Sequence, residues 1–306
     1  MSKQGNPAPI AVIILNYNNF PDTKACLECF DWNSRDFSLI VIDNCSTDDS
    51  WELLCEAYAD VPSITLIKSP DNRGYAAGNN QGIRHALQEG CEYICLLNND
   101  TILDPASLEA LARYLDEHPE CAMVGPLLCN NDESRSIQSA GAQINLWSGN
   151  VNPLHSKDDP KTLDREIVCG YISGACIMFR AQDVARLGYL PEDYFLYFEE
   201  TEWCLKASRM LGKIVCLTDT SIIHLGSATA AKMGSLTDYL MTRNRAAFER
   251  RNASKLQLAV FVCSMTAFIL SNELRHHDNS IRLFGYMCDG LLNRVRPEFK
   301  AFPIKA

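Results

Sequence analysis

Polar side chains follow four short apolar segments in the N-terminal third of the chain, and their types suit ligand binding. The amides and carboxylates come in four groups: Asn16-Tyr17-Asn18-Asn19, Asp43-Asn44, Asp71-Asn72-Arg73-Gly74 and Asn98-Asn99-Asp100. One such group alone is typical of a helix cap or a turn. In an open α/β sheet, however, ligands bind beyond the carboxyl ends of the strands. Four polar strand ends in succession therefore predict a binding crevice.

Two carboxylates in these groups indicate what the crevice would bind. Asp43 can accept hydrogen bonds from a base or a ribose, and Asp100 is a hard oxygen ligand for Mg²⁺ or Mn²⁺ bridging a diphosphate. The sequence has no G-x-G-x-x-G motif after the first apolar segment and no G-x-x-x-x-G-K-[ST] motif, so a dinucleotide site and a P-loop are disfavoured. A nucleotide with a diphosphate is the favoured ligand.

The segments that must position these groups alternate between strand and helix patterns. Four short apolar runs predict strands buried on both faces of a parallel sheet: 10–17, 38–44, 64–69 and 93–100. Helix signals lie between and after them, with Ser46 and Asp49 resembling a capping box and Asp104-Pro105 beginning a helix. A strand spacing of about 25–30 residues is typical of βαβ units. The expected fold class is therefore α/β, with a doubly wound, mostly parallel sheet.

The pattern weakens after residue 125. Residues 126–170 are rich in Gly, Pro, Ser and Asp and predict a hairpin or loop. A strand-like stretch at 168–180, a helix ending at Gly212 and two short strands at 213–218 and 221–225 follow. We expect a catalytic domain over residues 1–240 and a helical C-terminal extension over 241–306. Within the first, the nucleotide-binding half covers about 8–125 and the acceptor half about 126–240.

Charge is spread unevenly along the chain. The net charge is −10, which disfavours general nucleic-acid binding. Residues 1–240 carry 17 Lys or Arg against 33 Asp or Glu, whereas residues 241–306 carry 11 against 5. This basic tail contains an apolar segment at 258–270, too short to cross a bilayer as a helix. It is either an interfacial segment on an anionic membrane or, slightly favoured, a helix packed on the catalytic domain or on a second subunit of a homodimer.

The fourteen cysteines do not indicate a disulfide scaffold. Most lie within apolar segments, where Cys behaves as a small hydrophobic residue. The single C-x-x-C, Cys26 to Cys29, has no second pair to complete a zinc site. The first residues contain no apolar signal segment. We therefore expect a reduced, cytoplasmic protein, located at the inner face of the membrane if the tail binds lipid.

Seven sequence motifs, taken together, resemble a known family. They resemble family 2 glycosyltransferases of the GT-A fold and, most of all, their bacterial rhamnosyltransferase-like branch. The resemblance runs in order over residues 10–250 and is carried by NYNN (16–19), VIDNCSTD (41–48), NRGYAAGNNQG (72–82), LLNNDT (96–101), SGACIMFR (173–180), YFEETEWCLK (197–206) and IIHLGS (222–227).

The resemblance implies a donor pocket and a metal site. Asp43 matches the acid that holds the nucleobase and ribose, with Asn16 and Asn18 lining the same pocket. Asn98-Asn99-Asp100 matches the DXD motif, with Asn98 in place of the first acid; Asp100 keeps the metal contact, and His224 matches a histidine that completes the metal site. An imidazole ligand favours Mn²⁺ over Mg²⁺. The other donor-binding candidates in these motifs are Tyr17, Asn72, Arg73, Gly74, Asn79 and Asn99.

Some of these residues have a second interpretation. Arg73 and Arg84 suit donor phosphates or a solvated surface equally well. Gly74 and Gly78 suit close backbone approach. Arg243 and Asn244 match an Arg-Asn pair of this branch and are expected to face the donor or acceptor.

The resemblance also implies the reaction. Glu199-Glu200 matches an acidic pair whose second member is the base, but a second glutamate departs from the pattern and leaves Glu199, Glu200 and Glu202 as candidates. Inverting transfer needs one base to take a proton from the acceptor hydroxyl and a Lewis acid on the leaving diphosphate. Standing alone, the same acids are typical of a helix N-terminus.

The expected function is an inverting, metal-dependent transfer of a sugar to a saccharide or lipid-linked saccharide in cell-surface polysaccharide synthesis. The expected donor is dTDP-rhamnose first and a UDP-sugar second. A sugar nucleotidyltransferase is an alternative, but it would need a Gly-rich basic loop after the first strand, where NYNNFPD stands. A non-catalytic scaffold of a polysaccharide assembly complex is another, and the acids at 43, 100 and 200 argue against it.

Overall fold

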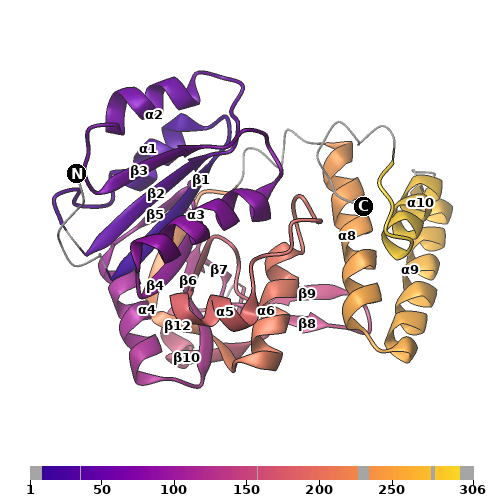
Figure 1. Ribbon diagram of the computed structural model, residues 1–306. Helices are drawn as coiled ribbons and strands as arrows, with labels where there is room; N and C mark the ends of the chain where they lie inside the picture. Colours follow the sequence, from indigo (N-terminus) through magenta and orange to yellow (C-terminus); the bar gives the residue numbers. More distant parts are fainter. Residues whose placement is uncertain (1–8, 35, 157, 227–233, 277–279, 297–306) are drawn as a thin grey trace.

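A computed structural model describes residues 9–34, 36–156, 158–226, 234–276 and 280–296. Strand and helix alternate in the N-terminal half, as the apolar runs predict (Figure 1). In chain order the elements of this half are β1 (Ile10–Asn16), α1 (Phe20–Leu27), β2 (Phe37–Asp43), α2 (Ser50–Tyr58), β3 (Ile64–Lys68), α3 (Tyr75–Glu89), β4 (Tyr93–Asn98), β5 (Thr101–Leu103) and α4 (Ala106–Glu117).

The second half is less regular and ends in helices. Its strands, helices and 3₁₀ turns are β6 (Cys121–Cys129), β7 (Ile137–Ser139), β8 (Ala142–Asn145), β9 (Asn150–Pro153), η1 (Pro160–Thr162), β10 (Glu166–Cys169), β11 (Cys176–Arg180), η2 (Ala181–Asp183), α5 (Val184–Leu187), α6 (Glu199–Met210), β12 (Lys213–His224), α8 (Ser235–Asn252), α9 (Lys255–His276) and α10 (Ser280–Leu291). The hairpin expected in 126–170 is β8–β9.

Within the described residues the main sheet has ten strands, with the path β10-β12-β6-β11-β4-β1-β2-β3 and with β5 and β7 paired to β12 and β6. The parallel pairing expected of β1 to β4 is confirmed. Antiparallel strands such as β11 make the second half mixed. The strand order reverses between β1 and β4, and such a switch point is where α/β sheets bind ligands.

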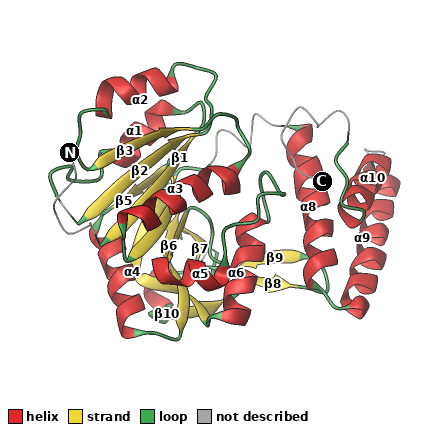
Figure 2. Cartoon of the chain, viewed as in Figure 1, coloured by secondary structure: helices red, strands yellow, loops and turns green. Residues whose placement is uncertain are grey.

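Both faces of the sheet are buried, which explains why β1 is apolar along most of its length (Figure 2). Ile10, Val12 and Ile14 pack with residues of α1, α2 and α4. Ala11 and Ile13 pack on the opposite face with residues of α3, α5 and α6. Each strand therefore ends at a fixed place between two helix layers, and its polar terminal residues reach the same edge.

The C-terminal helices pack beside the sheet domain (Figure 1). Leu236, Tyr239 and Leu240 of α8 pack with Phe195, and Phe248 packs with Phe198. The expected boundary between residues 240 and 241 falls inside α8, which is continuous across it. Of the two interpretations of the basic tail, packing against the catalytic part is what α8 shows.

Arginines of the tail take part in this packing. Arg245 donates from Nε to the carbonyl of Ser148 in the β8–β9 turn at 3.1 Å, and Arg251 pairs with Asp193 and Glu202. Part of the positive charge of the tail is therefore used inside the molecule. In the part of the chain that the structure describes, no helix combines the length and apolarity needed to cross a bilayer.

Two local expectations need correction. The capping box at Ser46 is wrong, because the Ser46 hydroxyl donates to Asp43 instead and α2 begins at Ser50. The stretch 168–180 is interrupted at Gly170 and Gly174, and the strands before and after these glycines, β10 and β11, occupy separate places in the sheet. The two short strands after Gly212 form one strand, β12, with an irregularity between Leu217 and Ser221.

Two further observations concern buried side chains. All fourteen cysteines lie within the described residues and are free, as expected. Trp203 belongs to the core: it is 1% exposed, its ring is edge-on to Phe179 and its Nε1 donates to the carbonyl of Gly188 at 3.1 Å.

Candidate active site

The pairing register brings the polar strand ends together. Asn16 lies opposite Asp43 in the β1–β2 pair, and Leu15 lies opposite Asn98 in the β1–β4 pair. At the start of β5, Thr101 lies opposite His224 of β12, and Asp100 is the residue before Thr101. The sequence places these residues far apart, and the sheet topology alone makes them neighbours.

The Asp43 carboxylate is buried and fully partnered. It accepts from Asn16 Nδ2 at 2.9 Å, from the Ser46 hydroxyl at 2.6 Å and from the Ser46 backbone N–H at 3.0 Å. Asn16 and Asp43 are each 0% exposed. In this conformation both residues therefore shape the end of β1 and β2 and offer no surface to a nucleotide.

Residues at the rim of this edge remain accessible. Asn18, with a positive φ of 51°, accepts at Oδ1 from the Thr47 backbone N–H at 2.7 Å and donates to the Thr47 hydroxyl at 3.1 Å. Tyr17 is half-buried beside it. Asn18 thus ties the end of β1 to the loop after β2, and Asn18, Tyr17 and Thr47 form the surface that a nucleotide would meet.

The donor candidates at 72–79 mostly contact protein. Asn72 Oδ1 accepts from Asn44 Nδ2 and from the Gly74 N–H, both at 3.0 Å. Asn79 is 1% exposed and donates to the Tyr75 carbonyl. Gly74 has a φ of 88°, and a Cβ there would lie 2.0 Å from the Phe195 carbonyl oxygen. Close backbone approach, rather than ligand contact, explains this glycine.

The two arginines expected near donor phosphates pair with one carboxylate instead. Arg73 Nη2 lies 2.7 Å from Glu192 Oε2, and Arg84 Nη2 lies 3.5 Å from Glu192 Oε1. Both pairs tie α3 and the loop before it to the segment that precedes α6.

Asp100 and His224 form a buried pair with a fixed histidine tautomer. His224 Nδ1 lies 2.8 Å from Gln138 Oε1, and Gln138 Nε2 donates to Asn130 Oδ1 at 3.3 Å. This amide orientation makes Nδ1 the donor and leaves the lone pair on Nε2. His224 Nε2 is buried, 3.3 Å from Asp100 Oδ1, and makes no hydrogen bond within the described residues.

These residues fit a divalent metal. Neighbouring ligand atoms on one ion, each about 2.0–2.2 Å from it, lie about 3 Å apart, close to the spacing of the two side chains. Among the described residues no group of three or more His, Cys, Asp or Glu side chains could hold a metal. Asp100 and His224 would therefore supply two ligands.

Asn98 and Asn99, the other two residues of this motif, differ in their surroundings. Asn98 is half-buried at the end of β4, where its backbone N–H donates to the Ala175 carbonyl at 3.0 Å. Asn99 donates to the Thr23 hydroxyl at 2.9 Å and so holds the start of α1.

Three glutamates at the start of α6 have three different environments. Glu199 is 1% exposed, and neither of its carboxylate oxygens has a hydrogen-bond partner within the described residues. Burial, and next the charge of Glu200, raise the pKa of Glu199 well above its ordinary value. Glu202 binds Arg251 at 3.2 Å and the Tyr194 hydroxyl. Neither is placed to receive a proton from a substrate.

Glu200 is half-buried and has the properties of a general base. Burial raises its pKa from 4.5 to about 7, although hydrogen bonding from its own backbone and from that of Gly174 lowers it. A base is most effective when its pKa lies near the working pH. A Cβ at Gly174 would lie 2.3 Å from Glu200 Oε1 and 2.7 Å from the Tyr75 hydroxyl. Only glycine allows the carboxylate to lie here.

The segment leading to Glu200 is strained. Phe195, Tyr197 and Phe198 have φ values of 68°, 69° and 76°, a region that costs a non-glycine residue about 1–3 kcal/mol. Such strain persists only where surrounding contacts impose it. Its position next to the candidate base marks the segment as part of the site.

Four residues of the site were missed at the sequence level. Gly174 and Ser46 each lie within a quoted motif, but the motifs give no role to Gly174, and Ser46 is predicted there to be a helix cap. Tyr75, which donates to the Gly174 carbonyl at 2.9 Å, also lies in a quoted motif. Gln138 lies in the irregular segment and gives no sequence signal.

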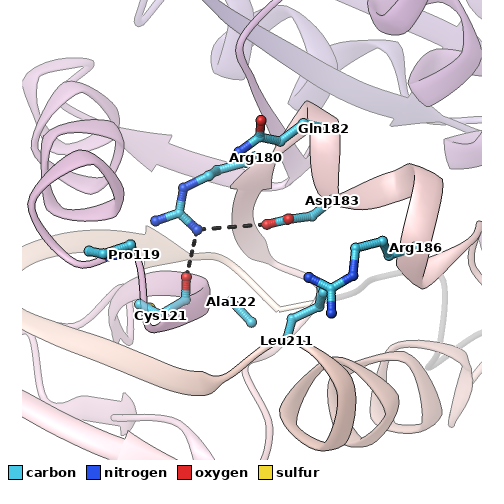
Figure 3. A pocket seen from close by; sticks show the side chains of 8 residues that line it. All are labelled: Pro119, Cys121, Ala122, Arg180, Gln182, Asp183, Arg186 and Leu211. Atoms are coloured by element: carbon cyan, nitrogen blue, oxygen red, sulfur yellow. Dashed lines mark hydrogen bonds and ion pairs between the residues drawn. The ribbon is translucent and has the colours of Figure 1, made fainter.

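A cavity of about 240 Å³ lies elsewhere (Figure 3). It is lined by Arg180, Asp183 and Arg186 and by the start of β6 at Cys121. Arg180 donates to the Cys121 carbonyl at 2.8 Å and lies 3.7 Å from Asp183. Because parallel strands begin at this end of the sheet, the cavity is separate from the strand ends described above.

Comparisons with known proteins identify the family of this chain. Residues 11–188 match the family model described as glycosyl transferase family 2. The low-salt glycan biosynthesis hexosyltransferase Agl10 of Haloferax volcanii is 26% identical over 65% of this chain and 62% of its own length. The dTDP-rhamnosyl transferase RfbF of Shigella flexneri is 22% identical over 80% and 78%. The N-acetylglucosaminyl-diphospho-decaprenol L-rhamnosyltransferase of Mycobacterium tuberculosis is 24% identical over 63% and 68%.

Solved structures show the same fold. S. aureus TarS in complex with UDP-GlcNAc has a TM-score of 0.57 at 19% identity, over 92% of this chain and 81% of that one. The mannosyltransferase PcManGT of Pyrobaculum calidifontis, in complex with GDP-Man and Mn²⁺, has a TM-score of 0.54 at 15% identity, over 96% and 83%. The fold expected from the motifs, a GT-A type α/β domain with a helical C-terminal region, is confirmed.

Proposed function

This chain belongs to glycosyl transferase family 2, and we propose that it is an inverting, metal-dependent enzyme that transfers rhamnose from dTDP-rhamnose. The acceptor is a hydroxyl of a saccharide or a lipid-linked saccharide. The observation that carries this proposal is the Glu200 carboxylate, half-buried against Gly174 with its pKa raised to about 7.

Glu200 acts as the base in this scheme. It takes the proton of the acceptor hydroxyl while that oxygen forms a bond to the anomeric carbon of the donor sugar. The bond between the anomeric carbon and the diphosphate oxygen breaks, and the nucleoside diphosphate leaves. Because one displacement occurs, the sugar is transferred with inversion. Burial raises the pKa of Glu200 to about 7 and so keeps its carboxylate basic.

Asp100 and His224 would hold the metal through Oδ1 and Nε2. A bound Mn²⁺ or Mg²⁺ supplies Lewis-acid stabilisation of charge on the leaving diphosphate. Gln138 keeps His224 in the tautomer that can bind a metal. Asn98, at the end of β4, would accept from a ribose or sugar hydroxyl, and Asn18 and Tyr17 would line the nucleotide side.

The relatives support the choice of substrates. Two of the three named above are rhamnosyltransferases, one of them acting on a diphospho-decaprenol lipid by its name. A UDP-sugar is the second donor, since TarS was solved with UDP-GlcNAc. A cytoplasmic location, synthesis of a cell-surface polysaccharide, a homodimer and contact of the tail with a membrane stay predictions.

The test is a binding and turnover screen. Thermal shift with dTDP-rhamnose, UDP-GlcNAc and GDP-mannose, each with and without Mn²⁺, reports which donor stabilises the native state. We expect the largest rise in Tm for dTDP-rhamnose, dependent on Mn²⁺, and NMR of the product to show inversion at the anomeric carbon. A metal-independent response, or a retained anomeric configuration, would contradict the proposal. A scaffold would bind no donor and turn over none.

A further inference from the structure

The segment 193–198 needs an external constraint to keep its shape. Three of its six residues lie in the left-handed region, Phe195, Tyr197 and Phe198, and none is a glycine or an asparagine, the residues that adopt it most readily. The segment lies between α5 and α6 and belongs to neither a helix nor a strand. Most of its carbonyl groups therefore need partners from other elements.

One buried amide meets three of the six carbonyl groups in this segment. Asn244 Nδ2, from α8, lies 2.9 Å from the carbonyl oxygen of Tyr194, 2.8 Å from that of Leu196 and 3.1 Å from that of Tyr197. The side chain is 0% exposed, so water does not compete for these acceptors. An amide nitrogen has two hydrogens, and one of them is shared between two of the three carbonyls.

The neighbouring arginine fixes which way the amide points. Arg243 Nη1 donates to Asn244 Oδ1 at 2.9 Å and to the Asp193 carbonyl at 3.1 Å. Because a guanidinium offers only donors, the Asn244 oxygen must face Arg243 and its nitrogen must face the segment. The match to the Arg-Asn pair predicts that Arg243 and Asn244 face the donor or acceptor. In the structure both face segment 193–198 instead.

The same segment fixes the candidate base at its C-terminal end. Phe198 is the residue before Glu199-Glu200, and its carbonyl accepts from the Glu202 N–H at 2.9 Å in the first turn of α6. At the other side, the Phe195 carbonyl accepts from the Tyr75 N–H at 2.8 Å, and Tyr75 contacts Gly174 beside Glu200. A shift of the segment would therefore move Glu200 relative to Gly174.

We propose that Asn244 is a positioning residue that acts through segment 193–198 to place Glu200, so that helix α8 of the C-terminal region is a working part of the active site. This inference rests on the proposed function of Glu200 as the base. It assigns to Asn244 no contact with donor or acceptor.

The test uses two substitutions in the full chain. Asn244→Asp keeps the shape but turns a carboxylate oxygen toward three carbonyls, and Asn244→Ala removes the donor with less repulsion, in case the first variant does not fold. In both we expect kcat for sugar transfer to fall by about 10–100-fold, the size of effect that a misplacement of about 1 Å can cause. We expect the donor Kd to change less than about threefold, because the donor edge of the sheet lies on other elements.

The pH profile separates positioning from simple loss of stability. If the segment no longer encloses Glu200, the acid limb of kcat moves below its wild-type position near the Glu200 pKa of about 7. Met265→Ala in α9, which lies in a C-terminal cluster with Ala246 and Phe261, lowers stability without touching the segment and should leave the limb in place. Asn252→Ala, which lies in α8 like Asn244 and donates to the Phe248 carbonyl, is the matched amide control.

Hydrogen exchange gives an outcome that does not depend on activity. In Asn244→Ala we expect faster exchange at 194–202 and 75–78, with β1 and β4 unchanged. Unchanged exchange there, or a loss of kcat with an unmoved pH limb, would overturn the inference. A wild-type protein that transfers no sugar from any tested donor would overturn the proposed function instead, while the exchange result still decides whether Asn244 holds the segment.

Discussion

Two buried carboxylate regions of this protein are treated in opposite ways. At the end of β1 and β2, Asp43 is 0% exposed and receives three hydrogen bonds from Asn16 and Ser46. At the start of α6, Glu199 is 1% exposed and, within the described residues, receives none. A buried carboxylate with donors organises structure, whereas one without them stores an electrostatic cost.

That difference indicates where the chemistry lies. The cost at Glu199 and Glu200 appears as a pKa raised by burial, to about 7 for Glu200. Proteins keep such unpaired groups mainly at functional sites, because a base must be able to take up a proton near neutral pH. Under the proposed function, the Asp43 region would frame the nucleotide end and the Glu200 region would move the proton.

Glu200→Gln should reduce sugar transfer more than any other substitution in either region. We expect transfer to fall by about 10²–10⁴-fold, the contribution of a general base, with donor affinity retained. Glu202→Gln, which alters a glutamate of the same helix that binds Arg251, should lose far less. Kinetics of both variants with a common donor is the measurement, and equal losses would remove the reason to assign the base to Glu200.

Glu200→Gln should lower activity but raise the free energy of unfolding at high pH. Because folding raises the pKa of Glu200 from 4.5 to about 7, the folded state holds its proton more tightly, and stability is lost as pH rises between these values. Glu200→Gln should therefore be more stable than wild type above pH 7, by about 1–3 kcal/mol, and equal to it near pH 4.5. Urea unfolding at the two pH values measures this; a variant less stable than wild type at high pH would contradict it.

Gly174→Ala should cause the next largest loss of activity. Its Cβ would lie 2.3 Å from Glu200 Oε1, so the carboxylate must move, and kcat should fall by about 100-fold. Gly170→Ala, whose Cβ would have no contact closer than 3.3 Å, is the matched control and should stay near wild type. Steady-state kinetics decides, and similar rates in the two variants would mean that the position of Glu200 does not matter.

Gln138→Leu tests the metal end of the site. Without the acceptor at Nδ1 the His224 tautomer is no longer fixed, and affinity for Mn²⁺ should weaken by about 10–100-fold. Titration of Mn²⁺ followed by electron paramagnetic resonance measures this in the absence of turnover. Gln143→Leu, a glutamine on the β8 strand that donates to Val168, is the control. Unaltered Mn²⁺ affinity in Gln138→Leu would show that Gln138 does not act on the site.

Asp43→Asn should have the smallest effect on chemistry. It replaces an acceptor by a donor opposite Asn16 and Ser46, so the free energy of unfolding should fall by about 1–3 kcal/mol. The acid limb of kcat should stay where it is in wild type, because Glu200 is untouched. Denaturant unfolding measures the change in stability, and a pH profile measures the position of the acid limb. A displaced limb would mean that the Asp43 region and the Glu200 region are coupled.

The sequence predicts more of the Asp43 region than of the Glu200 region. The four strand ends follow from local patterns, because a buried parallel strand must be apolar and its terminus is where polar residues can begin. The side chains there are less predictable: Ser46 was assigned to a helix cap, yet its hydroxyl binds Asp43. Both interpretations use the same hydroxyl, which would accept from a backbone N–H in a cap but donates to Asp43 here. Only the register of β1 and β2 decides between them.

The region around Glu200 depends on contacts that no local pattern contains. Asn244 acts across about fifty residues of sequence on a segment whose left-handed residues are aromatic, the opposite of what backbone propensity suggests. Gln138 reaches His224 from 86 residues away. The family motifs pointed to Glu200 and His224 themselves, but the residues that place them become visible only in the folded chain.

The most direct test of the account is the pH dependence of kcat for transfer, at saturating donor and Mn²⁺, from about pH 5 to about pH 9. The account predicts a single-proton rise centred near pH 7, the value to which burial raises the pKa of Glu200, and no such rise in the residual activity of Glu200→Gln. A kcat that is flat across this range, or the same rise in Glu200→Gln, would contradict the assignment of Glu200 as the base.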